Sequence, residues 1–244
     1  GPVRNREARI TNLPWQLKEK DLAAAAQMEQ LELVNDFGVL IYGLPHFEAD
    51  QQVVLQKGEQ DDGPLAILGA GTGLGMARGV RSASGLQALS SEGGHREFAP
   101  RSEDEWQLAC WLKQDLGIQR LSVERVVSGT GLGHVAHWLL QKPEAAHHPL
   151  RPLGEAWRQN MASDLPAQVS RAAEDGDPLM RHALELWLSA YGSASGDLAL
   201  QELCSGGRWI GGGTAAKQLK GLQSDTFLQA MRNKGRFQDF IKGL

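Results

Sequence analysis

The chain has 244 residues, of which 41% are apolar and 22% are charged, and its formal net charge is −4. It is long enough to bury a sizeable core in one large domain or two lobes, and without a long basic run it predicts no nucleic-acid partner. Its two cysteines, Cys110 and Cys204, cannot build a disulfide framework or a four-cysteine zinc site, and they are typical of a reducing cytosol.

The two ends of the chain predict a soluble fragment. The first ten residues are polar and basic, unlike a secretory signal, and no apolar run approaches a membrane-spanning length. The chain begins at Gly1-Pro2 without a methionine and ends at DFIKGL without a closing element, so we expect a piece of a longer protein.

The adjacent His147 and His148 fall in a Pro- and His-rich loop, where we expect solvated side chains and no metal site.

Five elements are expected before the first glycine-rich segment. They are an extended piece at Arg9–Asn12, a helix over Leu17–Gln30, a strand over Leu31–Asn35, a helix over Phe37–Leu44 and a strand over Val53–Leu55. The first of the two helices is rich in Ala, Glu and Lys, which favour helix. The strand over 31–35 ends at the polar pair Asn35-Asp36, and an α/β sheet usually places ligand groups at such strand ends.

The segment Leu65–Gly75, LAILGAGTGLG, predicts a β-hairpin around a glycine-rich turn. A buried strand over Leu65–Leu68 precedes glycines at every second position from 69 to 75, and a second strand over Met76–Val80 follows. Bare backbone N–H groups, together with the Thr72 hydroxyl, suit a phosphate. The segment matches neither the dinucleotide fingerprint nor the nucleoside-triphosphate P-loop, and a plain glycine-rich turn remains the alternative interpretation.

The remainder of the chain alternates strands and helices, which indicates an α/β fold. Ser102 with Glu105 predicts a capping box, and Gly117 predicts the end of that helix. Apolar residues at helical spacing from Leu179 to Tyr191 predict a core helix. The other expected elements are a strand over Gly85–Ser90, a helical turn over Ser122–Val127 capped by Ser122, a glycine turn over Ser128–Gly133 leading into a helix to Gln141, a helix over Gly196–Leu203, a strand over Gly206–Thr214 entering a third glycine turn, and a helix over Lys217–Leu222.

Three glycine turns in one α/β chain predict a nucleotide held mostly by backbone groups, with carboxylates near strand ends supplying the chemistry. Asp36 is a candidate general base for a hydroxyl group, the role that an aspartate has in phosphoryl transfer to an alcohol. Glu92, His95 and Glu124 have the acceptors and the donor that hydrogen-bond a polyol. Ordinary alternatives exist for the carboxylates: Asp36 caps the next helix, Glu92 lies at a surface turn, and Glu124 pairs with an arginine.

Six motifs, in their order along the chain, resemble those of the bacterial glucokinases. They are ITNLPW (Ile10–Trp15), LELVNDF (Leu31–Phe37), LGAGTGLG (Leu68–Gly75), EGGHREFAP (Glu92–Pro100), SVERVVSGTGL (Ser122–Leu132) and WIGGGT (Trp209–Thr214). EGGH followed by FAP, and NDF ahead of GAGTGLG, are the most specific of these motifs. Because glucokinases are ATP-dependent hexokinases of the actin-like, ribonuclease-H-like superfamily, the resemblance implies a two-lobe α/β sugar kinase.

The resemblance implies a sugar site and a nucleotide site. The sugar ligands that it implies are Asn12, Asn35, Asp36, Glu92, His95 and Glu124, with Asp36 as the base for the hexose 6-hydroxyl. The nucleotide ligands that it implies are Gly71, Thr72 and Gly73 in the second phosphate loop, Gly129 in SGTG, and Gly212 and Gly213 near the adenosine. The implied reaction converts D-glucose and ATP to glucose 6-phosphate and ADP at the entry of glycolysis, with Mg²⁺ bridging the ATP phosphates. The family also implies a cytoplasmic homodimer.

The chain departs from the family pattern in two ways: the N-terminal phosphate loop Asp-x-Gly-Gly-Thr is absent, and family chains continue past Leu244. Its two isolated cysteines argue against the related repressor/kinase branch, which carries a cysteine-rich zinc motif. Residues 1–45 are therefore expected to represent an incomplete small lobe that carries the sugar-site Asn-Asp pair. Residues 46–244 are expected to form a nearly complete large lobe with the phosphate, sugar and adenosine motifs. A non-catalytic sugar-binding or regulatory protein derived from a sugar kinase remains the alternative function.

Overall fold

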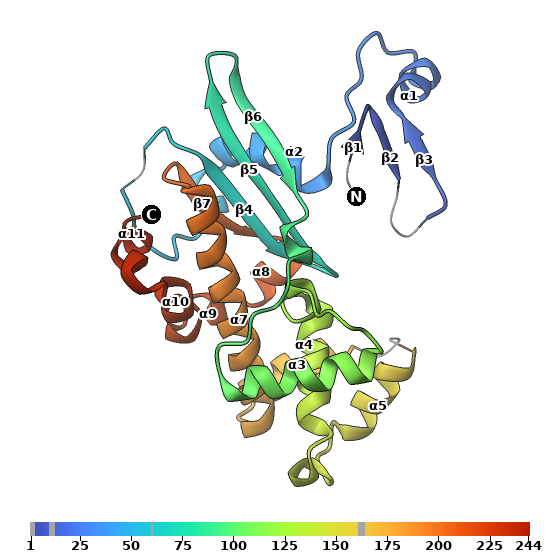
Figure 1. The fold of residues 1–244 in the computed structure, drawn as a ribbon, viewed down its shortest axis with the longest axis vertical. Coiled ribbons are helices and arrows are strands. Elements are labelled where there is room, and N and C mark those ends of the chain that lie inside the picture. Colours follow the sequence, from blue (N-terminus) through green and yellow to red (C-terminus); the bar gives the residue numbers. More distant parts are fainter. Residues whose placement is uncertain (1–2, 10–12, 60, 161–163) are drawn as a thin grey trace.

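A four-stranded sheet forms the centre of the molecule, in the order β6-β5-β4-β7 (Figure 1). The computed structural model describes residues 3–9, 13–59, 61–160 and 164–244. The strands of this sheet are β4 (Leu65–Ala70), β5 (Leu74–Ser82), β6 (Gly85–Ser91) and β7 (Gly207–Gly211). β5 is antiparallel to both β4 and β6, which confirms the predicted hairpin and the strand after it. β7 pairs with β4 in parallel, so the turns that follow these two strands lie at the same edge of the sheet.

A smaller three-stranded antiparallel sheet stands apart from this body (Figure 1). It consists of β1 (Val3–Arg4), β2 (Glu7–Arg9) and β3 (Gln16–Lys18), and α1 (Glu19–Ala26) follows it. The helix expected over 17–30 is therefore shorter at both ends. Gln27 is left-handed, with φ 55°, and Met28 donates its N–H to the Ala23 carbonyl at 2.9 Å, which ends the helix.

Two of the expected strands are wrong. Residues 31–35 are irregular; Leu33 donates its N–H to the Glu19 carboxylate at 3.3 Å, and Asn35 caps the next helix. Residues 53–55 are irregular as well, with both valines exposed. A strand needs the backbone of a partner strand for its hydrogen bonds, and a local sequence pattern cannot show whether that partner is there.

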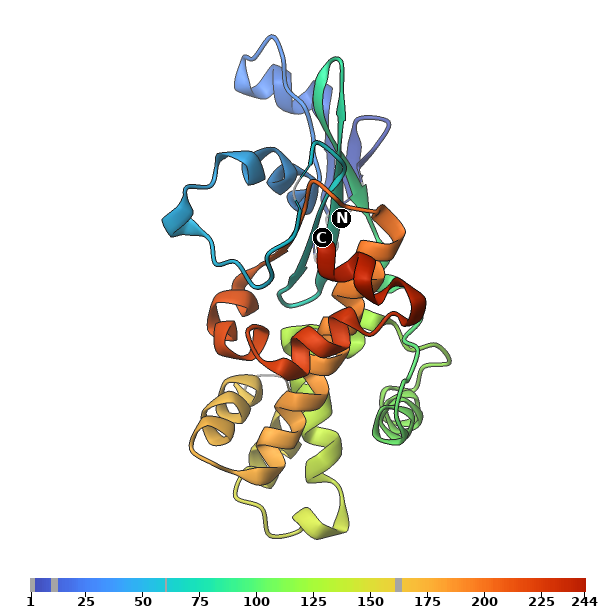
Figure 2. The same cartoon turned by 90° about the vertical axis from the view of Figure 1, so that its left-hand side faces the viewer.

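Helices lie on both faces of the central sheet, with α2 on one side and α7, α10 and α11 on the other (Figure 2). The α-helices that follow α1 are α2 (Asp36–Gly43), α3 (Glu103–Leu116), α4 (Gly129–Leu140), α5 (Arg151–Asn160), α6 (Leu165–Glu174), α7 (Pro178–Glu202), α8 (Gly213–Lys217), α9 (Leu219–Leu222), α10 (Asp225–Arg232) and α11 (Gln238–Gly243). Short 3₁₀ turns η1 to η6 lie at Leu44–His46, Ala49–Gln51, Gly93–His95, Val123–Arg125, Pro143–Ala145 and Gly235–Phe237. α2 confirms the helix expected at 37–44, and the helix expected at 217–222 is divided between α8 and α9.

β4 packs against different partners on its two faces, and all of its residues are buried. On one face Leu65 and Ile67 contact Ile41 of α2 and Leu44 just after it, in a small cluster. The intervening residues of β4 join the main core, to which α7 contributes: Ala66, Leu68 and Ala70. This alternation follows from the two-residue period of a strand, and it places the sheet between α2 and the helical body.

α7 is the continuous core helix of the molecule. It contains the predicted stripe from Leu179 to Tyr191, but the separate helix expected over 196–203 is wrong, because α7 continues to Glu202. Gly196 marks close packing instead of a break. A Cβ there would lie within 3.0 Å of the Met231 carbonyl oxygen of α10, so the glycine lets the two helix backbones approach.

The caps of α3 are confirmed in part. Ser102 is the N-cap and accepts the Glu105 N–H at 3.3 Å, while Gly117 ends the helix with φ 64°. The Glu105 carboxylate accepts the N–H of Arg101, the residue before the cap, at 2.7 Å. The predicted capping box is therefore only half formed, because the Glu105 carboxylate binds the N–H of Arg101 instead of the N–H of the N-cap Ser102.

The elements around residues 122–133 also differ from the prediction. Ser122 makes no side-chain cap, and only one 3₁₀ turn follows it. Ser128 is the N-cap of α4, and its hydroxyl oxygen accepts the Gly131 N–H at 2.9 Å. The predicted glycine turn over 128–133 is thus the first turn of α4 itself, because the serine cap lets the helix begin directly at Gly129.

The Phe37 side chain of α2 packs on the cross-strand pair Gly69 and Gly75. A Cβ on either glycine would lie within 3.0 Å of the Phe37 ring. The two glycines therefore allow the ring to contact the sheet backbone directly. This contact fixes the first turn of α2 beside the glycine-rich turn between β4 and β5.

We predict that Gly75→Ala lowers the free energy of unfolding by about 1–3 kcal/mol, because the added methyl group must displace the Phe37 ring. Gly43→Ala is the matched control, since a Cβ at this position of α2 meets no atom within 4 Å. The control should leave stability unchanged or raise it by up to about 1 kcal/mol. Urea unfolding measures both variants. Equal stability of Gly75→Ala and wild type would contradict the Phe37 contact.

His134 and His137 of α4 are buried, and desolvation lowers the pKa of both imidazoles below the usual histidine value. A ring nitrogen of His134, Nδ1, lies 2.8 Å from the Arg125 carbonyl oxygen. Because the unfolded chain binds protons at a higher pH than the folded chain does, acid favours unfolding. The contribution of these groups is constant above the unfolded-state pKa of about 6.5 and becomes destabilising as the pH falls below it.

We therefore expect the free energy of unfolding to fall between about pH 6.5 and pH 5, by up to about 1.4 kcal/mol per pH unit for each histidine. His134→Leu should flatten this dependence, even where it changes the stability at neutral pH. His147→Gln is the control, because His147 is exposed. Urea unfolding over this pH range provides the measurement, and an unchanged slope in His134→Leu would refute the assignment.

Candidate functional site

Three glycine-containing turns meet at one edge of the central sheet. The Gly71 carbonyl, in the turn from β4 to β5, accepts the Gly129 N–H at the start of α4 at 2.8 Å. The Thr72 carbonyl in the same turn accepts the Thr130 hydroxyl at 3.2 Å. A Cβ at Gly212, between β7 and α8, would lie 3.0 Å from the Ala70 carbonyl. The parallel pairing of β4 and β7 brings these turns together.

The first turn of α4 gives this edge a favourable environment for an anion. The Gly129 N–H donates to the Gly71 carbonyl, so the start of this helix lies against the turn from β4 to β5, and that end of a helix carries a partial positive charge. The sequence predicted Gly71, Thr72, Gly73, Gly129, Gly212 and Gly213 as nucleotide ligands, and the structure brings this set together. Backbone N–H groups and small side chains at such an edge suit phosphate groups.

The acidic loop, residues 92–95 directly after β6, lies beside the glycine turns. His95 Nε2 is 3.7 Å from a Glu92 carboxylate oxygen, and His95 Nδ1 is 3.9 Å from a Glu124 carboxylate oxygen. The side chains of His95 and Glu92 are about half exposed, at 56% and 54%, and Glu124 is 26% exposed. Glu92, His95 and Glu124 therefore form one group, the acidic cluster, in which carboxylate oxygens lie on both sides of the His95 ring.

Glu124 contacts both the acidic loop and the glycine turn. Its second carboxylate oxygen accepts the Leu74 N–H at 2.9 Å, and a Cβ at Gly73 would lie within 3.0 Å of that oxygen. This oxygen thus binds a backbone N–H, and not the arginine that the alternative interpretation paired with Glu124. The Glu124 carboxylate thus contacts both the predicted sugar subsite and the predicted nucleotide subsite.

Backbone pairing holds Glu124 opposite His95. The Val123 N–H donates to the Arg96 carbonyl at 2.9 Å, and the Phe98 N–H donates to the Leu121 carbonyl at 2.8 Å. These bonds flank an antiparallel bridge between residues 97 and 122. The segment after the acidic loop and the segment before Glu124 are therefore fixed side by side.

Asn35 and Asp36 begin α2 near this cluster. The Asn35 side-chain oxygen accepts the N–H groups of Phe37 and Gly38, both at 3.0 Å, so Asn35 provides the helix cap that the alternative interpretation assigned to Asp36. Asp36 is exposed, and its carboxylate accepts the Phe37 N–H at 3.1 Å. A Cβ at Gly38 would lie 2.8 Å from the hydroxyl oxygen of Ser90, near the end of β6 that leads into the acidic loop. Asn12, the remaining predicted sugar ligand, lies outside the described residues.

Sequence and structure comparisons identify the family. A family model named Glucokinase matches residues 1–244. The chain belongs to the glucokinase family. It is 40% identical to a glucokinase of Synechocystis sp. strain PCC 6803, over 99% of this chain and 70% of that protein. It is 38% identical to a glucokinase of Nostoc sp. strain PCC 7120, over 99% of this chain and 73% of that protein. Glucokinase enzyme activity, a kinase and transferase activity, follows from this membership.

Solved structures give the same fold. The crystal structure of a glucokinase from an Antarctic psychrotroph superposes with a TM-score of 0.79, at 30% identity, over 100% of this chain and 71% of that chain. A glucokinase of the ROK family from Streptomyces griseus superposes with a TM-score of 0.54, at 18% identity, over 90% of this chain and 62% of that chain. The chain has the actin-like α/β fold of these sugar kinases, as the resemblance to glucokinase motifs implied.

Two buried aromatic residues of α7 support the glycine turns of this glucokinase fold, and the sequence did not single them out for that role. The Trp187 indole N–H donates to the Ser128 carbonyl at 2.9 Å, and the Tyr191 hydroxyl accepts the Ala70 N–H at 3.1 Å. Both residues are fully buried, and burial raises the pKa of the Tyr191 phenol. The sequence carried one signal for this role: the indole N–H and the phenol hydroxyl, four residues apart on an apolar stripe, each need a hydrogen-bond partner when buried.

Other polar groups of the chain are used away from the glycine turns. His148 Nε2 lies 2.9 Å from an Asp177 carboxylate oxygen, so this histidine of the Pro- and His-rich loop is paired instead of solvated. Within the described ranges, no group of three candidate ligands suits a metal ion. The same residues include no helix with the length and apolar character needed to cross a bilayer.

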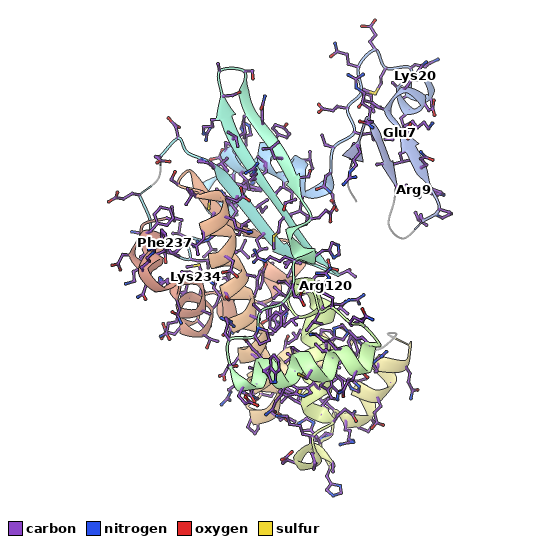
Figure 3. The ribbon with its side chains drawn as sticks, in the orientation of Figure 1. Glu7, Arg9, Lys20, Arg120, Lys234 and Phe237 are labelled. Atoms are coloured by element: carbon purple, nitrogen blue, oxygen red, sulfur yellow. The ribbon has the colours of Figure 1, made fainter. Side chains whose placement is uncertain are left out.

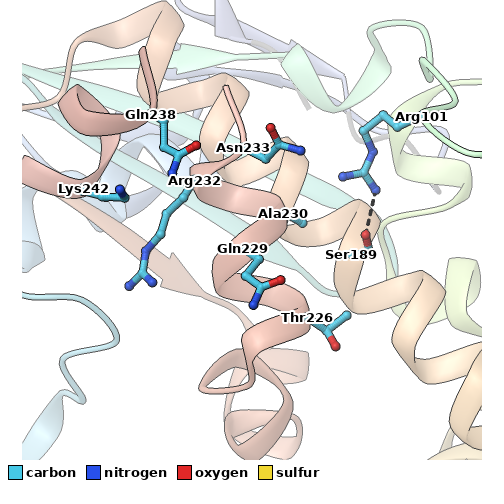
Figure 4. Close-up of a pocket in the computed structure, with 9 residues that line it drawn as sticks. All are labelled: Arg101, Ser189, Thr226, Gln229, Ala230, Arg232, Asn233, Gln238 and Lys242. Carbon is cyan, nitrogen blue, oxygen red and sulfur yellow. Dashed lines mark hydrogen bonds between the residues drawn. The ribbon is translucent and has the colours of Figure 1, made fainter. Parts of the chain in front are cut away.

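A cavity of about 660 Å³ is lined by residues of α7, α10 and α11 together with Arg101 (Figure 4). Its cations are already partnered within the chain. Arg101 pairs with Glu105 and donates to Ser189 at 3.0 Å, and Arg232 donates to Gln56 at 2.6 Å. None of the predicted sugar or nucleotide residues within the described ranges lines this cavity, so it is separate from the candidate site that they form.

We predict that Tyr191→Phe lowers the free energy of unfolding by about 1–3 kcal/mol, because the buried Ala70 N–H loses its acceptor. Tyr42→Phe is the matched control: the Tyr42 hydroxyl accepts the Ala88 N–H at 3.3 Å, but in an exposed position where water can replace it. The control should change stability by less than about 0.5 kcal/mol. Urea unfolding compares the two variants, and equal effects would contradict the buried support of β4.

Proposed function

We propose that the chain transfers the γ-phosphoryl group of ATP to the 6-hydroxyl of D-glucose, giving glucose 6-phosphate and ADP. The observation that carries this proposal is the double contact of Glu124, with one oxygen near His95 and the other on the backbone beside Gly73. A polyol bound by the acidic cluster would therefore lie directly against the turn that suits a phosphate. Family membership supplies the sugar kinase chemistry that this arrangement serves.

In the sugar site, carboxylate oxygens accept hydrogen bonds from sugar hydroxyls, and imidazole and amide groups donate or accept them. We assign this binding to Asn35, Asp36, Glu92, His95 and Glu124, with Asn12 as a further ligand outside the described residues. A glucokinase from Balamuthia mandrillaris was solved in complex with glucose, and the one from Streptomyces griseus in complex with glucose and AMPPNP. These complexes support D-glucose and ATP as the two substrates.

In the nucleotide site, the turn over 71–73 and the first turn of α4 would bind the phosphates through backbone N–H groups other than those of Gly71, Gly129 and Gly131, which already donate within the chain. Gly212 and Gly213 would lie on the adenosine side. Mg²⁺ would accompany ATP and neutralise its phosphates. Because the described residues supply no set of three protein ligands for a metal, we assign the ion to the nucleotide and to water.

The reaction needs a base at the sugar hydroxyl. Asp36 would accept the proton of the 6-hydroxyl as the oxygen attacks the γ-phosphorus, and ADP would leave with the bridging oxygen. The exposed position of Asp36 at the start of α2 leaves its second carboxylate oxygen available for a substrate. Closure of the small lobe over the large lobe would exclude water and suppress transfer to solvent. A homodimer and a cytoplasmic location stay predictions of the family resemblance.

We predict that Asp36→Asn lowers kcat by about 10²- to 10⁴-fold, since the amide cannot accept the proton. Glucose binding, measured by calorimetry, should change by less than about tenfold, because the amide keeps its hydrogen bonds to the sugar. Asp50→Asn is the control, as Asp50 is exposed in η2 and outside the cluster.

Turnover of Asp36→Asn at the wild-type rate under saturating glucose would show that Asp36 is not the base. The wild-type chain is assayed in parallel for glucose-dependent ADP release. Glucose binding by the wild-type chain without turnover would instead favour the sugar-binding alternative predicted from the sequence.

A further inference from the structure

Arg96, the residue after His95, joins the acidic loop to the core helix α7. Its guanidinium donates to the Gln201 side chain at 2.7 Å and to the Ala194 carbonyl at 3.3 Å. It also lies 3.5 Å from an Asp197 carboxylate oxygen. These three acceptors are three or four residues apart, so they lie on one face of α7 over two turns. The planar guanidinium can hold several acceptors of this kind in a fixed geometry.

Asp197 is shared between two cations from different parts of the chain. Its other carboxylate oxygen accepts Lys234 Nζ at 2.6 Å, and Lys234 also donates to the Ser193 hydroxyl at 2.9 Å. Lys234, labelled in Figure 3, is only 9% exposed, and Arg96 is 23% exposed. Exposed ion pairs contribute little, and the Asp197 side chain is 44% exposed. The two cations, in contrast, are largely removed from water and hydrogen-bonded, Arg96 also to Gln201 and the Ala194 carbonyl, so their geometry is well defined.

The backbone on either side of Arg96 is also fixed. The Arg96 N–H donates to the Gly93 carbonyl at 3.2 Å, which closes the η3 turn, and the Arg96 carbonyl accepts the Val123 N–H. Arg120, labelled in Figure 3, donates to the His95 carbonyl at 2.7 Å. Among the described residues, in contrast, the imidazole of His95 makes only the two long approaches to Glu92 and Glu124. Its position therefore depends on how firmly the backbone holds it.

We propose that Arg96 is a positioning residue for the sugar site. Through Asp197 it anchors the loop that presents Glu92 and His95, and so keeps that loop at its distance from Glu124. This role rests on the proposed function, because it assigns sugar binding to the loop. Arg96 itself need not touch the sugar, and the glycine turns that face the nucleotide are held by other contacts, from Trp187 and Tyr191.

The first test compares three variants of the full chain. Arg96→Gln and Asp197→Asn both remove the ion pair, and each should raise the Kd and the KM for glucose by about threefold to tenfold. The KM for ATP should stay within about twofold of wild type, and Arg96→Lys, which keeps the charge, should recover part of the loss. Arg78→Gln is the matched control. Arg78 also pairs with a carboxylate of α7, Glu202 at 2.9 Å, but from β5 and away from the acidic loop.

The second measurement does not depend on sugar binding. The imidazole ring-proton signal of His95 in the NMR spectrum, assigned with His95→Gln, should shift in Arg96→Gln and stay unchanged in Arg78→Gln. An unchanged His95 signal, or an unchanged Kd for glucose in Arg96→Gln, would overturn the positioning role. Equal increases in the KM values of both substrates, together with a lowered Tm, would also overturn it, since they indicate a general structural role. If the wild-type chain does not bind glucose, the proposed function fails, and the sugar-positioning role fails with it.

Discussion

Burial of β4 on both faces is the constraint on which the candidate site depends. One face packs on α2 and the other joins the main core with α7, so this strand cannot shift without disturbing two hydrophobic clusters. The Tyr191 hydroxyl accepts the N–H of Ala70, the last residue of β4. The carbonyl of Gly71, the next residue, accepts the Gly129 N–H at the start of α4. The position of the glycine turn is therefore set by the core and by hydrogen bonds to its backbone from Tyr191, Glu124 and Thr130.

The two predicted subsites share structure instead of lying side by side as independent pockets. Glu124 touches the acidic loop with one oxygen and the glycine turn with the other. The Phe37 ring packs on Gly69 and Gly75, and this places the Asn35-Asp36 start of α2 at the same edge of the sheet. A displacement of the glycine turn would consequently move both a sugar ligand and the base proposed for catalysis. Such an arrangement suits a transfer reaction in which both substrates must be aligned.

Local patterns in the sequence were sufficient where local interactions decide the structure. The hairpin around the glycine turn, the Ser102 cap and the stripe of α7 depend on neighbouring residues, and their predictions are confirmed. The strands expected at 31–35 and 53–55 failed because strand formation depends on a distant partner. Gly196 looked like a helix boundary because its reason, the backbone of α10, lies more than 30 residues further along the chain. The resemblance to glucokinase motifs implied that Glu124 and His95 share a site, but no pattern in the sequence showed the pairing of residues 96–98 with 121–123 that brings them together.

The acidic cluster combines a firm backbone with loose side chains. The approaches of His95 to the two carboxylates are 3.7 and 3.9 Å, and all three side chains contact water. Charge interactions in such a setting are weak, and they strengthen when a ligand excludes water. If a polyol binds here as proposed, the polar groups of the cluster would therefore gain most of their interaction energy only when it occupies the site. Rigid support from α7 and from the paired segments would reduce the entropy that the loop loses at that moment, which makes the loose geometry compatible with selective binding.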